Sequence, residues 1–404
     1  MNTYTPSEEI LQKYADVMVN FALWGGKGIN KGDVVHVTLP ESAKAFLEPI
    51  QVSILKAGGH MILDYKPIDR LGYTRAFFEH ASDEQLLFHP KDYLLEQVNT
   101  VDHYLVVLAT HDKYHLKGMD SKKMMEPRKA MKFYYDARDV KEANNAQSWT
   151  ICLYGTDAMA EDVQLTPKEY WNEIINACYL DEQDPVEKWK EIDTILTQTT
   201  EWLNGLDIKT IHVKGDDADI TYELGEKRKW LAGRGCNIPS FEVFTSPDFR
   251  GTNGWITFNQ PLYRYGNRIS GIRLEFKNGD VVNATAEENE DLLKEMIAIP
   301  GMEKVGEFSL TDKRLSKISK FMGETLFDEN MGGEFGNTHI ALGRSFPDAY
   351  AGDSNAMEKE DWKNLGYNDS AEHVDVISTA DRVVTATLAD GTEKVIYKNG
   401  EFQM

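Results

Sequence analysis

The stretch "DVVHVTLPESAKAFLEPIQVSILKAGGHMILDY" (residues 33–65) decides the fold of the first half of the chain. Residues 33–40 and 60–65 are short runs rich in Val, Ile and Leu, which is typical of strands. Residues 42–59 lie between them, and their hydrophobic pattern predicts a helix. The two glycines at its end are a common signal for a helix C-terminus. A strand, a helix and a strand in this order predict a right-handed crossover between parallel strands.

The same alternation continues on both sides of this stretch. Upstream, Thr5-Pro6-Ser7-Glu8 has the pattern of a capping box with Pro at the first helical position, and predicts a helix start. Downstream, residues 104–110 and 149–155 are apolar and predict two more strands, with a helical stretch at 121–143. We therefore predict an α/β N-terminal domain with a mainly parallel sheet.

The predicted pattern of helices and strands changes after about residue 208. A second capping box, Thr166 to Glu169, and a helical run at 185–206 come just before the change, so we place the domain boundary there, with domains 1–190 and 191–404. Beyond it, strand-like runs alternate with probable hairpin turns at Asn278-Gly279 and Asp390-Gly391. The second domain is predicted to be α+β with antiparallel sheet.

Composition and charge exclude several classes of protein. The formal net charge is −22, from 44 basic and 66 acidic residues, and it repels nucleic acid and anionic lipid. No apolar run approaches the roughly 20 residues that span a membrane, and the N-terminus lacks a signal-peptide pattern. We therefore expect a soluble, cytoplasmic protein that binds neither nucleic acid nor membrane.

Common catalytic and binding motifs do not occur in the chain. The glycines of "LWGGKGINKGD" precede a predicted strand and do not match a phosphate-binding loop. The sequence has no G-x-S-x-G elbow and no H-E-x-x-H helix. The three cysteines are far apart and form no C-x-x-C pair, so a disulfide framework or a thiolate metal site is not expected.

Charged residues do occur inside apolar or Gly/Pro-punctuated runs of the second half. They fall in four segments: Glu242 in "NIPSFEVFTSPD", Glu307 in "KVGEFSL", His339 in "GNTHIALG", and His373 with Asp375 in "EHVDVIS". Charged groups seldom enter such runs unless they are paired or coordinate a metal.

The spacing of His373 and Asp375 adds a geometric reason for a metal site. Residues two apart on a strand point to the same face, so these two side chains can converge on one centre. Three carboxylates and two imidazoles form an oxygen and nitrogen ligand set that suits Zn²⁺, Co²⁺ or Mn²⁺. Five ligands exceed the need of one tetrahedral ion, which favours two metal ions that share a carboxylate.

A structural interpretation stands beside the metal hypothesis. A single histidine in an apolar strand is more often a hydrogen-bonded structural residue, and a glutamate beside aromatic residues often pairs with a buried arginine. Four further histidines lie in similar runs, and for them we keep this interpretation: His36, His60, His103 and His212.

The motifs of the second half resemble those of the thermophilic-type metallo-aminopeptidases, the family of aminopeptidases T, S and PepS. The resemblance lies in the order and spacing of the motifs and covers nearly the whole chain, less closely between about 110 and 200. The motifs that carry it are "LQKYADVMVNFALWGGKGINKGDVVHV", "NIPSFEVFTSPD", "GEFSL", "TLFDENMGGEFGNTHIALG" and "HVDVIS".

The resemblance implies an activity and a site. By motif position the metal ligands fall on Glu242, Glu307, His339, His373 and Asp375, and hold two divalent metal ions. The general base falls on Glu307. The implied reaction is metal-dependent hydrolysis of the N-terminal residue from peptides with a free N-terminus, in a homodimer.

One position departs from the family pattern. The family commonly has a Tyr seven residues after the histidine of "HIALG", where this chain has Phe346. Tyr350, four residues further on, could supply the phenol only if the loop folds back. Loss of one electrophilic donor can weaken transition-state stabilisation by roughly 2.7 to 4 kcal/mol.

Two other functions remain open from the sequence. His339, His373 and Asp375 alone match the 2-His-1-carboxylate set of a mononuclear Fe(II) enzyme, and ring-cleaving dihydroxypyridine dioxygenases are similar in fold to this family. A non-catalytic, peptide-binding relative is the third reading, in which Phe346 marks lost activity. The number of bound metal ions separates the peptidase from the dioxygenase.

Overall fold

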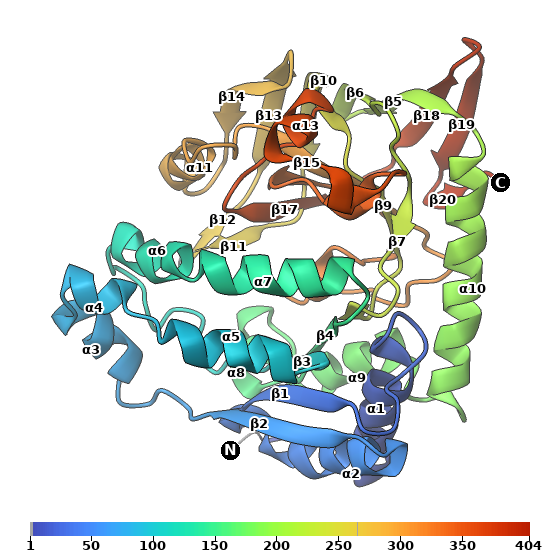
Figure 1. Cartoon of the computed structure of the whole chain (residues 1–404). Coiled ribbons are helices and arrows are strands. Elements are labelled where there is room, and N and C mark those ends of the chain that lie inside the picture. Colours follow the sequence, from blue (N-terminus) through green and yellow to red (C-terminus); the bar gives the residue numbers. More distant parts are fainter. Residues whose placement is uncertain (1–2, 265) are drawn as a thin grey trace. The chain divides into compact units, whose positions relative to one another are not determined.

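The computed structural model describes residues 3–264 and 266–404, which fall into two compact units. The first unit comprises residues 1–190, 234–239 and 265–267, and the second comprises 191–233, 240–264 and 268–404. Each unit has a sheet core of its own (Figure 1).

A parallel sheet forms the core of the first unit, with strand order β2-β1-β3-β4-β8. Val35 lies opposite both Met61 and His103, so β1 is a central strand with parallel neighbours on each side. This confirms the predicted α/β class and its parallel sheet. The strands are β1 (Val34–Pro40), β2 (His60–Lys66), β3 (His103–Leu108), β4 (Ser148–Leu153) and β8 (Asn237–Ile238).

Helices cover both faces of this sheet; Figure 1 shows α2 on one side and α5 and α7 on the other. The helices up to residue 204 are α1 (Glu8–Val17), η1 (Met18–Ala22), η2 (Glu41–Phe46), α2 (Leu47–Ala57), α3 (Tyr73–His80), α4 (Asp83–Leu87), α5 (Lys91–Thr100), α6 (Ser121–Ala130), α7 (Lys132–Ala143), α8 (Asp157–Asp162), α9 (Pro167–Ala177) and α10 (Pro185–Asn204). None of the helices in the described part of the chain combines the length and the apolar composition that a membrane crossing requires.

Helix boundaries confirm some sequence signals and correct others. The capping box at Thr166 and Glu169 is present, and Gly58 ends α2 in the left-handed conformation with φ of 86°. The predicted cap at Thr5 is wrong, because Ser7 is extended and its hydroxyl accepts from the Ile10 N–H at 3.3 Å. The later cap places two glutamates in the first turn, where the helix dipole favours negative charge.

The predicted helical stretch 121–143 is two helices and not one. The chain breaks between α6 and α7 at Met131, whose ψ of 1° departs from helical geometry. A proline inside α6, Pro127, removes one backbone donor from that helix.

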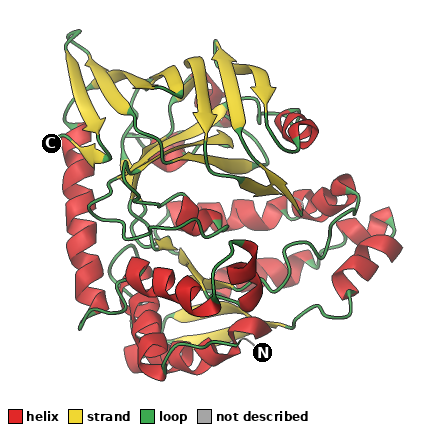
Figure 2. Ribbon diagram, turned by 180° about the vertical axis from the view of Figure 1, so that it is seen from behind, coloured by secondary structure: helices red, strands yellow, loops and turns green. Residues whose placement is uncertain are grey.

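Two antiparallel sheets form the second unit, as predicted, and strands predominate there (Figure 2). The eight-stranded sheet contains β14 (Asp280–Thr285), β13 (Ile272–Lys277), β10 (Asp248–Phe258), β6 (Ala218–Glu223), β5 (Ile208–Gly215), β18 (Val383–Leu388), β19 (Glu393–Lys398) and β20 (Glu401–Phe402). The five-stranded antiparallel sheet contains β17 (His373–Ser378), β16 (Asn337–Gly343), β15 (Val305–Thr311), β9 (Glu242–Thr245) and β7 (Leu231–Ala232).

Aromatic side chains connect these two sheets. The ring of Phe308 on β15 lies 5.0 Å from Tyr222 on β6 and 6.1 Å from Trp230, measured between ring centroids, and all three are buried. One face of the five-stranded antiparallel sheet is therefore core, and its other face is left for different chemistry.

The remaining elements of the chain are short. They are a two-stranded sheet of β11 (Leu262–Arg264) and β12 (Asn267–Ile269), and the helices α11 (Glu290–Ile297), α12 (Thr325–Asp328), η3 (Pro347–Ala349), η4 (Ser354–Ala356) and α13 (Lys359–Asn364). The predicted turn at Asn278-Gly279 joins β13 and β14, with φ of 52° and 92°.

Candidate metal centre

All five predicted ligands lie on one face of the five-stranded antiparallel sheet. Ala341 pairs with both Glu307 and Asp375, and Gly343 pairs with His373. Paired residues of antiparallel strands share a face, so four strands bring their polar side chains to the same side.

The opposite face explains the apolar runs in which these residues occur. Val374 and Val376 alternate with His373 and Asp375 along β17 and are 4% and 1% exposed. They belong to the face that packs as core, while the histidine and the carboxylate turn away from it. The strand is therefore apolar on one side and polar on the other.

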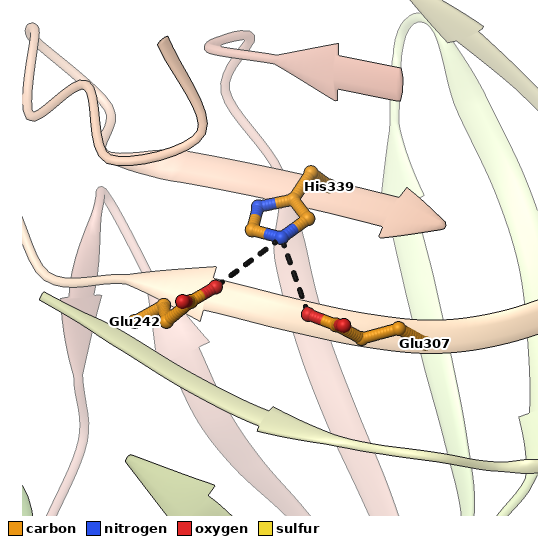
Figure 3. A group of neighbouring side chains, drawn as sticks. All are labelled: Glu242, Glu307 and His339. Carbon is orange, nitrogen blue, oxygen red and sulfur yellow. Dashed lines mark ion pairs between the residues drawn. The ribbon is translucent and has the colours of Figure 1, made fainter. Parts of the chain in front are cut away.

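Glu242, Glu307 and His339 form the first ligand group (Figure 3). Nε2 of His339 lies 3.5 Å from Oε2 of Glu242 and 3.4 Å from Oε1 of Glu307. The imidazole is buried, and neither of its nitrogens has a hydrogen-bond partner among the described residues. A buried imidazole aimed at two carboxylates fits a metal ion.

Glu307, His373 and Asp375 form the second ligand group. Nε2 of His373 lies 3.3 Å from Oε2 of Glu307 and 3.4 Å from Oδ1 of Asp375. The Nδ1–H of His373 donates to the carbonyl oxygen of Arg344 at 2.8 Å, which leaves Nε2 as the free ligand atom. Glu307 is shared, with one oxygen toward each imidazole.

Charge balance gives a second test of whether the residues suit divalent cations. In each group the potential ligand atoms lie within 4.8 Å of one another. Three carboxylates face two imidazoles, so the cluster is rich in negative charge that burial makes unfavourable. Divalent ions offset that charge, and the oxygen and nitrogen donors fit them.

The pKa values follow from the same contacts. Burial alone would lower the pKa of His339 and of His373, but the neighbouring carboxylates raise both well above the usual imidazole range. Burial alone would raise the pKa of Glu307, but the two imidazoles lower it. Without metal the cluster is thus stabilised as imidazolium–carboxylate pairs.

Metal loading near pH 7 is therefore expected to release protons. The raised pKa values favour the protonated forms of His339 and His373 in the metal-free protein, whereas a metal ligand must be neutral imidazole. Calorimetry in two buffers with different ionisation enthalpies measures this release. Equal heats in both buffers would contradict it. Apparent metal affinity should accordingly fall as the pH is lowered.

Two buried serines orient Glu242. Ser240 Oγ donates to Oε1 and Ser309 Oγ donates to Oε2, each at 3.3 Å. Such supporting hydrogen bonds hold a carboxylate in its ligand orientation. We expect Ser309→Ala to weaken metal binding by about 10- to 100-fold with the fold retained. Metal titration with a competing chelator measures the change, and unchanged affinity would show that Ser309 has no such role.

A further buried carboxylate, Glu329, interacts electrostatically with the cluster and was missed by sequence reasoning. It is 7% exposed, and its pKa is raised well above the usual range by burial and by the charges of Glu242 and Asp375. It follows Asp328, the last residue of α12, and precedes Asn330; this polar triplet has the pattern of an exposed turn, but all three residues are buried. Its place inside a quoted family motif was the only available signal.

The centre is more accessible on the β17 side. The side chains of His373 and Asp375 are 23% and 15% exposed, against 1% for His339. A small pocket adjoins Asp375 and is also lined by Tyr263, Thr325 and Asp328. A small ligand can therefore reach the second ligand group.

The ring that lies against His373 is Phe346, at 4.6 Å between centroids. Tyr350 packs elsewhere, with its ring 5.4 Å from that of Trp362 and only 7% of the residue exposed. The position at which the family commonly has a phenol thus carries a benzyl group beside a predicted ligand.

Two of the histidines that we interpreted as structural have hydrogen-bonded partners. In the first unit His103 is buried, with Nε2 2.9 Å from Asp33 Oδ2 and Nδ1 2.9 Å from Ser148 Oγ. The Ser148 hydroxyl also accepts from the Trp24 N–H, which suits a structural network. In the second unit His212 pairs with Asp219 at 2.7 Å.

Comparison with known proteins defines the class as metallo-aminopeptidase. Aminopeptidase AmpS of Bacillus subtilis is 29% identical, covering 97% of this chain and 98% of that protein, and aminopeptidase 2 of Geobacillus stearothermophilus is 27% identical, covering 98% of each. The thermophilic metalloprotease family (M29) matches residues 7–402, and the chain belongs to this family. The family predicted from the motifs is confirmed.

Two solved structures share the fold. AmpT from Thermus thermophilus has a TM-score of 0.83 at 24% identity, covering 98% of this chain and 100% of that chain. The 2,5-dihydroxypyridine dioxygenase of Pseudomonas putida KT2440 has a TM-score of 0.50 at 12% identity, covering 98% of each. The likeness to the dioxygenase concerns the fold alone.

Proposed function

We propose that this enzyme removes the N-terminal residue from peptides with a free α-amine, at a centre of two divalent metal ions. One observation carries the proposal: Glu307 directs one oxygen to His339 and the other to His373, so that two three-residue ligand groups share one carboxylate. Glu242 completes the first group and Asp375 the second. A shared carboxylate is the usual bridge of a two-metal site.

Different residues of the centre have different roles in the reaction. When bound, two divalent ions polarise the scissile carbonyl and lower the pKa of water. Glu329, which has a raised pKa, receives the proton of the attacking water on its carboxylate and passes it to the leaving amine. The family resemblance places the base on Glu307 instead, and that assignment stays a prediction. The excess negative charge attracts the cationic N-terminus of the substrate.

We also propose the identity of the metal ions, the oligomeric state and the cellular location. Zn²⁺, Co²⁺ and Mn²⁺ suit the oxygen and nitrogen ligands. The catalytic part is the predicted domain 191–404, which contains all five ligands. A homodimer in the cytoplasm is the expected form of the enzyme.

Metal analysis combined with a peptide panel tests the function. The purified chain should contain two divalent ions and release free N-terminal amino acids, and chelation should abolish that release until metal is restored. Amino-acid release that survives complete metal removal would refute the proposal. One iron per chain with oxygen consumption would support the dioxygenase instead.

Phe346→Tyr tests whether the missing phenol limits turnover. The backbone holds residue 346 beside His373, so a hydroxyl introduced there adds an electrophilic donor near the reacting carbonyl. We expect kcat to rise about tenfold or more with bound metal unchanged, since removing one such donor lowers kcat by roughly 10²-fold or more in other enzymes. No gain in kcat would show that this chain does not depend on a phenol there.

A further inference from the structure

We propose that the rings of Phe244 and Phe346 form an apolar wall that receives the side chain of the substrate's N-terminal residue, so that the enzyme prefers peptides beginning with a large apolar residue. This inference rests on the proposed function and adds its substrate class. The wall is defined by these two residues and lies beside His373.

Phe244 belongs to the face that carries the ligands. It stands two residues after Glu242 on β9 and pairs with Ser309, which in turn pairs with His339. The residues that flank it, Val243 and Thr245, point to the opposite face and are fully buried. Phe244 itself is only half-buried, so its ring is not part of the core between the two sheets.

Phe346 completes the wall from the loop after β16. Its ring is also half-buried and lies 5.8 Å from Phe244 and 4.6 Å from His373, between centroids. A partly exposed pair of aromatic rings beside a polar cluster is an unfavourable use of apolar surface unless a ligand covers it. Apolar walls next to a few polar groups are typical of small-molecule subsites.

The wall is held in place before a substrate arrives. The N–H of Phe346 donates to the Oγ of buried Ser246 at 2.8 Å, and the Arg344 carbonyl accepts from Nδ1 of His373 at 2.8 Å. Between them, Ser345 and Asn368 exchange backbone and side-chain hydrogen bonds at 3.0 Å. A fixed surface loses little entropy on binding, which favours selectivity.

The N-terminal side chain is the part of the substrate that best fits this place. It begins at the Cα atom, one bond of about 1.5 Å from the carbonyl carbon that reacts. If the scissile carbonyl binds at the second ligand group, the side chain of the N-terminal residue lies next to His373. The Phe346 ring packs against His373 and therefore lines that place. A leucine or phenylalanine side chain buries apolar surface there that glycine lacks.

Two dipeptide series test the inference. In one the first residue is Gly, Ala, Leu or Phe before a constant second residue, and in the other the order is reversed. We expect the enzyme to favour Leu and Phe over Gly at the first position by about tenfold or more in kcat/KM. Phe244→Ala and Phe346→Ala should each reduce that preference severalfold, with less effect on the Gly peptide.

A binding measurement makes the test independent of turnover. Free L-leucine differs from glycine only in its side chain, so it should bind more tightly than glycine to the unmodified enzyme by calorimetry. This difference in affinity should shrink in both variants. Phe249→Ala is the matched control. Phe249 lies on β10 in the same unit, is also half-buried, and packs against Lys304, away from the ligands. It should keep both the preference and the binding difference.

Three outcomes would overturn the inference. They are an unchanged first-residue preference in variants that retain metal and circular dichroism, a shift confined to the second-residue series, and equal binding of leucine and glycine by the unmodified enzyme. Failure of the unmodified enzyme to release any amino acid contradicts the proposed function instead. The binding of leucine and glycine then still tests whether the two rings receive an apolar side chain.

Discussion

Glu307→Gln is expected to lower kcat/KM by about 10³-fold or more. The two oxygens of Glu307 lie 3.4 Å and 3.3 Å from the two imidazoles, and a carboxamide replaces one of them by an NH₂ group that cannot ligate. Metal assistance supplies several kcal/mol of transition-state stabilisation, and about 4 kcal/mol corresponds to about 10³-fold.

Metal content separates this effect from unfolding. The variant should bind fewer than two ions per chain while its circular dichroism stays that of the unmodified protein. Glu275→Gln is the matched control, since Glu275 is a half-buried glutamate of the same unit that pairs with Arg273 at 3.2 Å on β13. If Glu307→Gln kept two ions and near-normal activity, the shared-carboxylate centre would be wrong.

Glu329→Gln is expected to lower kcat by about 10²- to 10⁴-fold, with KM and metal content nearly unchanged. The carboxamide keeps the shape of the side chain but cannot accept a proton. Burial and the charges of Glu242 and Asp375 raise the pKa of Glu329 in the metal-free centre, and a higher pKa makes a carboxylate a better proton acceptor.

Single-turnover kinetics with metal analysis tests this role. Glu334→Gln serves as the control, because Glu334 lies five residues along the same connection to β16 but is exposed. A variant that lost metal together with activity would make Glu329 a ligand. A variant that kept full kcat would remove Glu329 from proton transfer and leave Glu307 as the predicted base.

The two substitutions together distinguish the two assignments of the base. If Glu307 only bridges, its loss changes metal content and activity in parallel. If Glu329 transfers the proton, its loss changes kcat while the metal centre stays intact. In the metal-free centre the two imidazoles lower the pKa of Glu307 against the effect of burial, whereas burial and the neighbouring carboxylates raise that of Glu329.

Features that depend on neighbouring residues in the chain were predictable. The strand, helix and strand of residues 33–65 formed the parallel pair β1 and β2, because the hydrophobic pattern and the glycine stop act locally. His373 and Asp375 share a face because the side-chain period of a strand is two. The cap at Ser7 was missed since Thr5 offers a similar hydroxyl and only backbone geometry chooses between them.

Features that depend on distant contacts were not predictable by pattern alone. Asp328 ends a four-residue helix and the polar residues Glu329 and Asn330 follow it, so nothing local indicates that all three are buried. Their burial results from packing against other parts of the unit, as in the hydrogen bond from the Phe241 N–H to the side chain of Asn330 at 2.6 Å.

The sequence by itself determined which residues were available for the centre: a period of two marked the charged side chains that face away from the core. Only the tertiary structure decided that these side chains meet. Glu242 and Asp375 are 133 residues apart, and the register of four antiparallel strands brings their carboxylates to one face. The same register places Phe244 beside the ligands, because cross-strand pairing depends on the whole sheet and not on adjacent residues.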